Sequence, residues 1–204
     1  FKKEFGHPER QKAELNHESE ESYLDDLGRD IAPGSDGLVL QPLWNPGLGD
    51  VGPEARGSII GFNDGHTRAH LYRALLEGLA YALREGKERI EKRSKIPIER
   101  LQVSGGGSQS DVVMQILADV MNLPADRPST FEASGLGAAI IGAVSLGYYS
   151  DFHAAAKAMT GVTKTFSPHP QNVESYDKLF RTVYTKQYER LKPLYIALEQ
   201  LRNN

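Results

Sequence analysis

The sequence predicts an α/β fold that contains more helix than sheet. Short apolar runs that end near glycine or proline alternate with longer segments whose apolar residues recur at helical spacing. Strands that alternate with helices through short connections are typical of α/β domains. The strand-like runs are too few for a doubly wound sheet, so we expect residues outside this chain to complete the sheet.

The predicted strands lie at 37–44, 58–62 and 98–107, and the glycine- and proline-rich segment 45–57 between the first two is a predicted loop. A long predicted helix begins after Thr67, and another follows the third strand. Two further helices are predicted, a glycine- and alanine-rich one at 134–147 and a short one from Asp151 to Gly161. The C-terminal stretch at 172–200 is also predicted to be helical, and Pro193 kinks or interrupts it.

The long helix has leucine at four positions spaced by four residues, so we expect one of its faces to lie in the core. These residues are Leu71, Leu75, Leu79 and Leu83. The 134–147 helix is rich in small residues, which lets a helix approach its neighbour closely. We therefore expect Gly135 and Gly137 to serve packing rather than ligand binding.

Charge and composition argue against several classes of protein. The chain has 204 residues, with 24 Lys and Arg against 27 Asp and Glu, and a net charge of -3. The sequence lacks the basic stripe that would indicate a nucleic-acid partner. There are no cysteines, which excludes disulfides and thiolate metal sites. His66 and His70 share helical spacing but lack a nearby carboxylate pattern, so we expect a solvated helix start and no metal site.

The sequence also bears on location. No signal peptide opens the chain, and no apolar run approaches the roughly 18 residues of a membrane-spanning helix. We therefore expect a cytoplasmic protein with no membrane partner. The chain begins at Phe1, inside an amphipathic segment and without an initiator Met, so we expect a piece of a longer protein.

Three consecutive glycines, Gly105, Gly106 and Gly107, separate the third predicted strand from the helix that follows it. Three glycines in a row cost conformational entropy on folding, so either the backbone is unusual here or something lies against it. Ser108 or Ser110 is placed to cap the following helix. A glycine loop before a helix N-terminus suits a nucleotide, because free N–H groups and the helix dipole favour negative charge.

Spacing alone does not decide between a nucleotide site and a glycine-rich turn that binds nothing. The loop lacks the Lys-Ser or Lys-Thr of a Walker motif, and it does not fit the dinucleotide pattern G-x-G-x-x-G because Ser110 stands at the last position. Other segments of the chain are needed to choose between the two interpretations.

The segment GSIIGFNDGHTRAHLYRALLEGLAY resembles the second signature of the FGGY family of carbohydrate kinases. The matching positions are Gly57, Ile59, Gly61, His70, Leu71, Ala74, Leu75, Leu76 and Glu77, while Phe62 departs mildly from the usual aliphatic residue. GGGSQSDVVMQILADVMNLP resembles the family's adenine-side loop and helix, and EASGLGAAIIGAVSLGYY resembles its later small-residue helix. The three segments follow the family order and cover about 37–165.

The resemblance implies a kinase of two actin-like, ribonuclease-H-like domains, with the sugar or polyol mainly on the first and MgATP mainly on the second. On that plan, residues 1–204 form the later part of the C-terminal, ATP-binding domain, and the N-terminal sugar-binding domain is absent. Gly105, Gly106 and Gly107 would face the adenosine part of ATP. Ser110 stands where the family has a polar contact to the base, and Asp111 more readily caps its helix.

The family's catalytic aspartate, phosphate-binding turn and most sugar contacts would precede this chain, so no residue here is assigned a catalytic role. Mg²⁺ would be held mainly through ATP. In the intact enzyme the aspartate would take the proton from a sugar hydroxyl that attacks the γ-phosphorus. We expect the chain alone to be inactive. We also expect it to be either marginally stable or self-associating, with a homodimer as one form. The alternatives are a non-kinase actin-like ATPase or sugar-sensing module, and a plain α/β scaffold with an empty turn.

Overall fold

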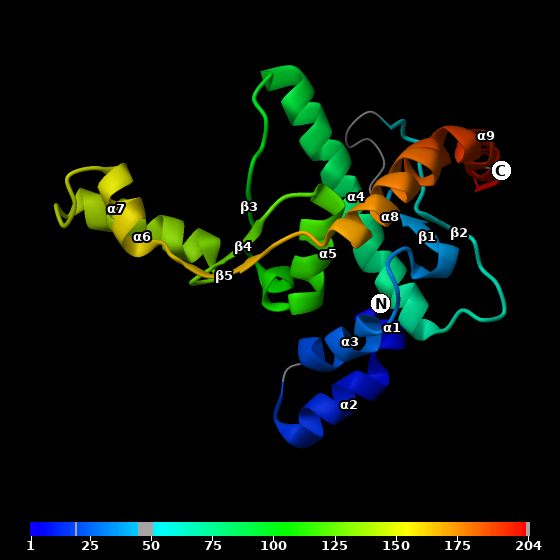
Figure 1. Cartoon of the computed structure of the whole chain (residues 1–204), viewed down its shortest axis with the longest axis horizontal. Coiled ribbons are helices and arrows are strands. Elements are labelled where there is room, and N and C mark those ends of the chain that lie inside the picture. The colour runs from blue at the N-terminus through cyan, green and yellow to red at the C-terminus, as the bar shows by residue number, and fades with distance from the viewer. Residues whose placement is uncertain (19, 45–50, 203–204) are drawn as a thin grey trace.

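The computed structural model describes residues 1–18, 20–44 and 51–202, so part of the predicted loop at 45–57 lies outside the described residues. A long central helix, α4 (Arg68–Ser94), has α5 (Asp111–Met121) and α8 (Pro170–Leu179) beside it. The N-terminal helices lie together at one end of the molecule, and α6 and α7 form an arm that projects from its side (Figure 1). The bounds of these helices are α1 (Lys2–Phe5), α2 (His7–Asn16), α3 (Glu20–Arg29), α6 (Ala133–Ser145) and α7 (Phe152–Met159).

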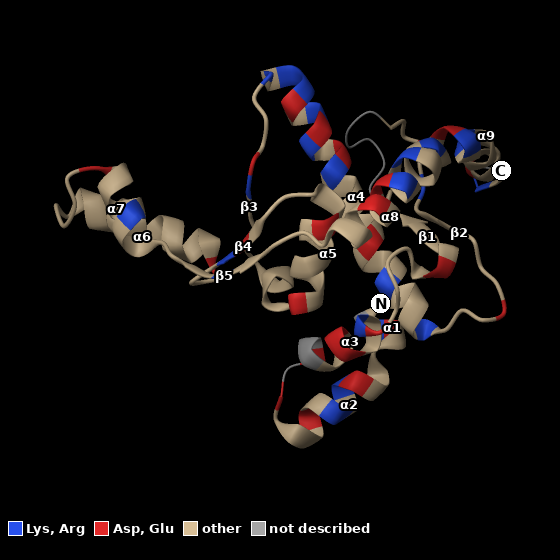
Figure 2. Cartoon of the chain, viewed as in Figure 1, with Lys and Arg blue, Asp and Glu red and all other residues tan. Residues whose placement is uncertain are grey.

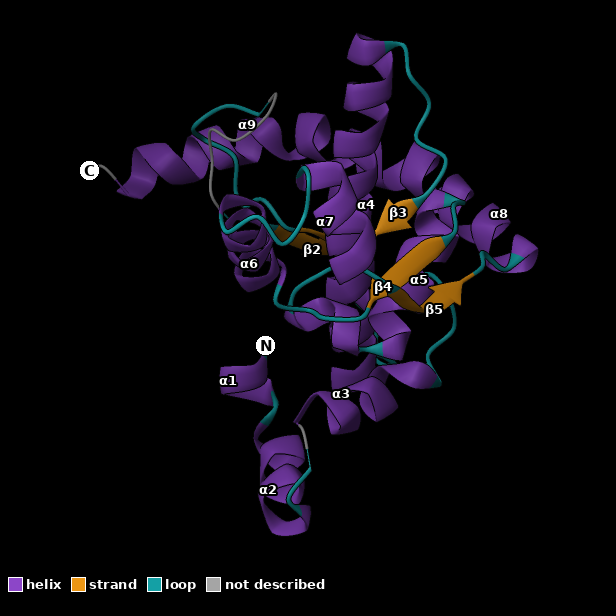
Figure 3. Cartoon of the chain, turned by 90° about the vertical axis from the view of Figure 1, so that its left-hand side faces the viewer, coloured by secondary structure: helices purple, strands orange, loops and turns teal. Residues whose placement is uncertain are grey.

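The described strands form two small sheets. In the first, β1 (Val39–Gln41) pairs antiparallel with β2 (Ser58–Ile60). In the second, β4 (Ala125–Pro128) lies between the parallel strand β3 (Leu101–Gln102) and the antiparallel strand β5 (Val162–Phe166), as Figure 3 shows. The α/β prediction is confirmed, and each of the three predicted strands contains an observed one. Strands β4 and β5 were not predicted, because neither has an alternating apolar pattern.

Thr67 is the N-cap of α4, as predicted, and its backbone N–H donates to His70 Nδ1 at 3.2 Å. The expected leucine face is wrong in its second half, because Leu79 and Leu83 are exposed. The buried face of α4 runs instead through Gly78 and Tyr81. A Cβ on Gly78 would lie 2.3 Å from the carbonyl oxygen of Leu40, so the missing side chain lets β1 press against this face.

The main core joins α4 to the C-terminal helices through aromatic side chains, and α5 adds aliphatic side chains to it. The ring of Tyr81 lies 5.0 Å from that of Tyr184 and 6.1 Å from that of Tyr176, which it meets edge to face. Phe180 stacks on Tyr184 at 5.8 Å. Aromatic pairs at these separations contribute about 0.5–1.5 kcal/mol beyond their burial.

The C-terminal helical stretch was predicted, but its interruption lies elsewhere. Helix α8 continues through a π-helical turn at Phe180–Tyr184 into α9 (Thr185–Arg202). Pro193 lies inside α9 and does not end it. The change of helical hydrogen bonding therefore occurs where Phe180 and Tyr184 enter the core, rather than at the proline.

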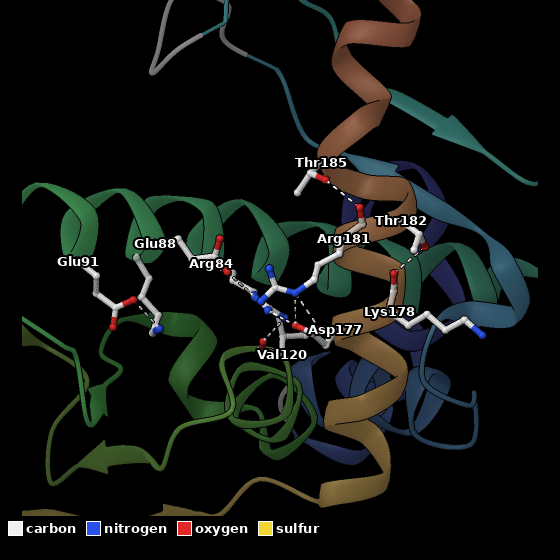
Figure 4. A network of polar contacts seen from close by, with 10 residues as sticks. Arg84, Glu88, Glu91, Val120, Asp177, Lys178, Arg181, Thr182 and Thr185 are labelled. Atoms are coloured by element: carbon white, nitrogen blue, oxygen red, sulfur yellow. Dashed lines mark hydrogen bonds and ion pairs between the residues drawn. The ribbon is translucent and has the colours of Figure 1, made fainter.

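Arg84 links three helices at the edge of this core (Figure 4). Its guanidinium donates to the carbonyl oxygen of Val120, at the end of α5, at 3.2 Å and to Asp177 of α8. Asp177 also accepts from Arg181 Nε at 3.0 Å. The guanidinium lies 4.2 Å from the centre of the Phe180 ring. Arg84 thus fixes α4 against both neighbours.

The α6–α7 arm differs from the rest of the molecule. No described residue of α6 is buried, and a Cβ on Gly135 or Gly137 would meet nothing within 4 Å. The expectation that these glycines serve close packing is therefore wrong within the described residues. Figure 2 shows few charged residues on the arm, whereas Lys, Arg and Glu crowd the far end of α4. In the described ranges no helix is both long and apolar enough to cross a membrane.

Candidate functional site

The glycines of the segment at 57–77 have structural reasons to be glycine. Gly61 has a φ of +95°, and a Cβ there would lie 2.1 Å from the carbonyl oxygen of Gly37. A Cβ on Gly57 would lie 2.3 Å from the Trp44 ring. Any side chain at either position would collide with its neighbour. These two glycines therefore hold β2 and the turn after it close to the β1 region.

Glu77, the acidic residue of the same segment, organises the turn at 34–37, whose first two residues are buried. Its carboxylate accepts from the Gly34 N–H at 3.0 Å, from Ser35 Oγ at 2.9 Å and from Tyr176 Oη at 2.8 Å. The four successive residues 34–37 all have positive φ. This conformation is unfavourable for the two that are not glycine, so the turn needs outside support. Glu77 supplies it from α4.

Arg73 balances the buried charge of Glu77. Its Nε donates to the Glu77 carboxylate at 2.9 Å, and its Nη2 donates to Tyr176 Oη at 2.7 Å. Burial disfavours the charged guanidinium, but Tyr176 and Glu77 more than offset this and raise the pKa of Arg73. Arg73, Glu77 and Tyr176 thus form one buried network that holds α4 against the turn at 34–37.

His66 and His70 also serve the start of α4. His66 Nδ1 accepts from the Asn63 N–H at 3.0 Å, and His70 Nδ1 accepts from the Thr67 N–H. Both rings thereby stabilise the turn that leads into the helix.

The glycine loop follows β3 at the end of the parallel pair β3–β4. Gly105 has φ 86° and ψ -178°, and its N–H donates to the carbonyl oxygen of Phe131 at 3.0 Å. A 3₁₀ turn, η2 (Gly106–Gln109), leads from it to α5. Ligands of open α/β sheets bind at the carboxyl ends of the strands, which is where this loop lies.

The three glycines differ in their reasons to be glycine. Gly105 needs its positive φ, whereas Gly106 and Gly107 have φ values outside the left-handed region. Among the residues that the structure describes, a Cβ on Gly106 would meet nothing within 4 Å, and one on Gly107 would meet only Val113 Cγ1, at 3.8 Å. Neither the backbone nor a neighbouring side chain therefore requires glycine at 106 or 107. The space beside them is open.

Ser110 caps α5 and faces the interior. Its Oγ accepts from the Val113 N–H at 3.0 Å and donates to the carboxylate of Asp25, and the residue is 6% exposed. The cap is therefore Ser110 and not Ser108, whose Oγ donates to the carbonyl oxygen of Gly105 at 2.8 Å. A contact from Ser110 to a nucleotide base stays a prediction, and its hydroxyl already has two partners within the chain.

Asp25 of α3 was missed by the sequence analysis. Burial raises the pKa of this carboxyl, although hydrogen bonds from Ser110 and from the Val112 and Asp111 N–H groups act in the opposite direction. Asp25 thus accepts hydrogen bonds at the N-terminal end of α5, although it lies 85 residues before Ser110 in the sequence. No local pattern near Asp25 points to this role, because a contact over such a distance depends on the fold.

A small cavity of about 260 Å³ lies beside the loop, between the second sheet and α6. Its lining includes Ser104 at the start of the loop, Thr130, and Leu136, Gly137 and Ile140 of α6. Ligand pockets usually measure about 300–1,000 Å³, so this cavity suits one ring system rather than a whole nucleotide.

Comparisons with known proteins give the class of this fold and site. A model of the FGGY family of carbohydrate kinases, C-terminal domain, matches residues 5–146. The chain is 34% identical over 156 residues to a xylulose kinase of Lactococcus lactis subsp. lactis, covering 74% of this chain and 30% of that protein. It is 34% identical over 167 residues to a glycerol kinase of Pseudothermotoga lettingae, covering 81% of this chain and 32% of that protein.

A solved structure agrees with these relatives. The crystal structure of xylulose kinase from Rhodospirillum rubrum matches with a TM-score of 0.73 and 33% identity, covering 86% of this chain and 35% of that one. The fold is therefore that of the actin-like sugar kinases. The chain belongs to the FGGY family of carbohydrate kinases, and the matched range contains both the 57–77 segment and the glycine loop. It spans about a third of the length of the relatives it matches.

Proposed function

We propose that this chain is the later part of the C-terminal, ATP-binding domain of a kinase that transfers the γ-phosphate of ATP to a sugar or polyol hydroxyl. Its own share is to bind and orient the nucleotide. Holding reactants in line supplies much of the catalysis in phosphoryl transfer. The group that removes the hydroxyl proton, and most of the sugar contacts, are assigned to sequence beyond this chain.

The observation that carries this proposal is the open space at Gly106 and Gly107. Glycine there is not required by a positive φ or by a contact within the described residues. A ligand that lies flat on the backbone would give both positions a reason to lack a side chain. The adenosine part of ATP fits, because its sugar and base present broad faces and few charges.

The electrostatics of the loop favour adenosine over the phosphates. A helix N-terminus normally attracts anions. Here Asp25 accepts hydrogen bonds at the end of α5, and Asp111 lies in its first turn. The N–H groups at this helix end already have partners in Asp25 and Ser110, so we place the phosphate groups away from α5 and the nucleoside against Gly105–Gly107.

The remaining assignments belong to this proposal and rest on family membership. Mg²⁺ would reach the site with ATP and neutralise phosphate charge, and the acceptor would be a small sugar or polyol. A cytoplasmic location and a homodimer stay predictions.

A titration tests the proposal on the chain itself. We expect adenosine and MgADP to shift the backbone amide resonances of Gly105, Gly106 and Gly107 in a saturable way, and pyrophosphate to leave them in place. The same loop response to pyrophosphate would contradict the assignment of the nucleoside to the loop. No response to either nucleoside compound would contradict nucleotide binding by this chain.

A further inference from the structure

Arg127 reaches the glycine loop from the neighbouring strand. It lies on β4, and its Nε donates to the carbonyl oxygen of Ser108 at 2.5 Å. Its Nη2 donates to Asp111 Oδ1 at 2.6 Å and lies 3.4 Å from the carbonyl oxygen of Gln109. One guanidinium thus contacts two successive peptide groups of η2 and the first residue of α5.

The position of Arg127 in the sheet is itself irregular. The pairing of β4 with β5 shifts register between Arg127 and Pro128. Bulges of this kind bend a strand and change the direction of a side chain, and they are frequent beside active sites. The irregularity here coincides with the residue whose side chain leaves the sheet for the loop.

Other groups hold the guanidinium in this orientation. It lies 5.1 Å from the centre of the Phe166 ring of β5. Lys164, also of β5, donates to Asp111 Oδ2 at 2.5 Å, so Asp111 receives one cation on each oxygen. Partial burial disfavours the charge of Asp111, but the hydrogen bonds from Lys164 and Arg127 lower its pKa, so the carboxylate is charged at neutral pH.

We propose that Arg127 is a positioning residue for the nucleotide, which sets the shape of the glycine loop by fixing the carbonyl groups of Ser108 and Gln109. The inference rests on the proposed function of the loop. A peptide plane whose carbonyl is held cannot rotate, so its N–H is held as well. Arg127 thereby fixes the end of the turn whose start is Gly106 and Gly107, and it does so without contact with the ligand.

The planar fork of arginine is the feature that this role requires. Its N–H groups diverge in fixed directions, whereas the ammonium of lysine is a compact charge on a flexible stem. Lysine at 127 would keep the positive charge near Asp111 and Phe166 but could not hold both carbonyl groups.

Arg100 offers a matched control. Its Nη1 donates to both oxygens of Asp126, at 2.8 and 2.6 Å, on the same sheet. Asp126 adjoins Arg127 in the sequence, but these two hydrogen bonds from Arg100 do not involve the loop. The Arg100 side chain is exposed, whereas the Asp126 carboxylate is buried and also accepts from Thr165 Oγ1 at 2.5 Å. Arg100→Gln therefore measures how the loss of a positive charge on this sheet affects stability and amide exchange when the loop contacts of Arg127 are kept.

The test compares the whole chain with Arg127→Gln, Arg127→Lys and Arg100→Gln. Amide hydrogen exchange is measured at Ser108 and Ser110, whose N–H groups donate within the turn to Gly105 and Gly107. The dissociation constant for adenosine and the melting temperature are measured on the same samples. In both Arg127 variants we expect the exchange rates of these amides and the dissociation constant for adenosine to rise about tenfold. A change of this size is typical of the loss of one charge-assisted hydrogen bond. The melting temperatures should stay near that of Arg100→Gln.

Three outcomes would overturn the inference. Exchange at Ser108 and Ser110 that is as slow in Arg127→Gln as in Arg100→Gln would show that Arg127 does not hold the loop. Wild-type behaviour of Arg127→Lys would show that charge matters and the fork does not. Faster exchange with unchanged adenosine affinity would show a structural role only. If the wild-type chain does not bind adenosine, the proposed function fails, and the exchange rates still decide whether Arg127 shapes the loop.

Discussion

Gly105 and Gly106 are adjacent, yet different physical demands act on them. Gly105 adopts a φ of +86°, which a side chain would strain. Gly106 has no such dihedral and no neighbour within 4 Å of a Cβ. In the 57–77 segment, Gly61 must be glycine because it lies against a backbone carbonyl. Glu77 of the same segment supports the turn at 34–37. Glycines in these two segments thus divide into those that the backbone or a close neighbour requires and those that neither requires.

The role of Glu77 predicts a large stability effect at one residue. Glu77→Gln keeps the shape of the side chain but leaves Arg73 without its charged partner in a buried site. Removal of one partner of a buried ion pair typically costs about 3–5 kcal/mol. The free energy of unfolding from urea titration measures this.

Glu88→Gln is the control, because Glu88 pairs with Arg84 on α4 but is 42% exposed. It should cost less than about 1 kcal/mol. Equal costs for the two variants would show that Glu77 does not hold the turn at 34–37.

The contact between α3 and α5 is carried by Asp25 and Ser110. The pKa of Asp25 is raised above its ordinary value of 3.8, so the folded state binds this proton more readily than the unfolded chain. The stability that comes from this group is fully present below the unfolded pKa and is lost as pH rises through the folded pKa. The packing of these two helices is therefore weakened as Asp25 ionises.

Asp25→Asn should remove the fall in stability that accompanies ionisation of Asp25. We expect the free energy of unfolding of the wild type to fall relative to that of the variant as pH rises above about 4. Asp26→Asn provides the comparison, because Asp26 is 60% exposed and pairs with Arg29 at the surface. A difference between wild type and Asp25→Asn that does not change with pH would contradict this account.

The elements show how far sequence patterns reach. The cap at Thr67, the glycine loop before α5 and the cap at Asp151 were predicted because each depends on a few neighbouring residues. Strand β5 was not predicted, because four of its five residues are exposed and show no alternation. The buried face of α4 was misplaced because Gly78, which sequence periodicity ignores, is where β1 approaches. Asp25 and Arg127 act on the loop from other elements, which no local pattern reveals.

On the scale of the molecule, the loop lies where separate parts of the chain meet. Helix α3 reaches it through Asp25, β4 through Arg127, and the segment before α6 through the carbonyl of Phe131. Large apolar side chains stay exposed on the arm, among them Leu146, Tyr148 and Phe152. Exposed apolar patches commonly mark surfaces that meet other protein. The family relationship and the meeting of these parts at the loop are consistent with the proposal that the chain binds a nucleotide there.

The most direct test of the central claim, that adenosine lies on the glycine loop, is the dissociation constant of MgADP for Gly106→Val. Because a Cβ at Gly106 meets none of the described residues within 4 Å and φ needs no glycine, the variant should fold with a melting temperature near that of the wild type. The branched side chain should then enter the space of the nucleoside and raise the dissociation constant tenfold or more, about 1.4 kcal/mol or above. Gly105→Val, at the positive φ, should instead lower stability by about 1–3 kcal/mol. An unchanged dissociation constant in a folded Gly106→Val variant would mean that the loop serves the turn and not the nucleotide.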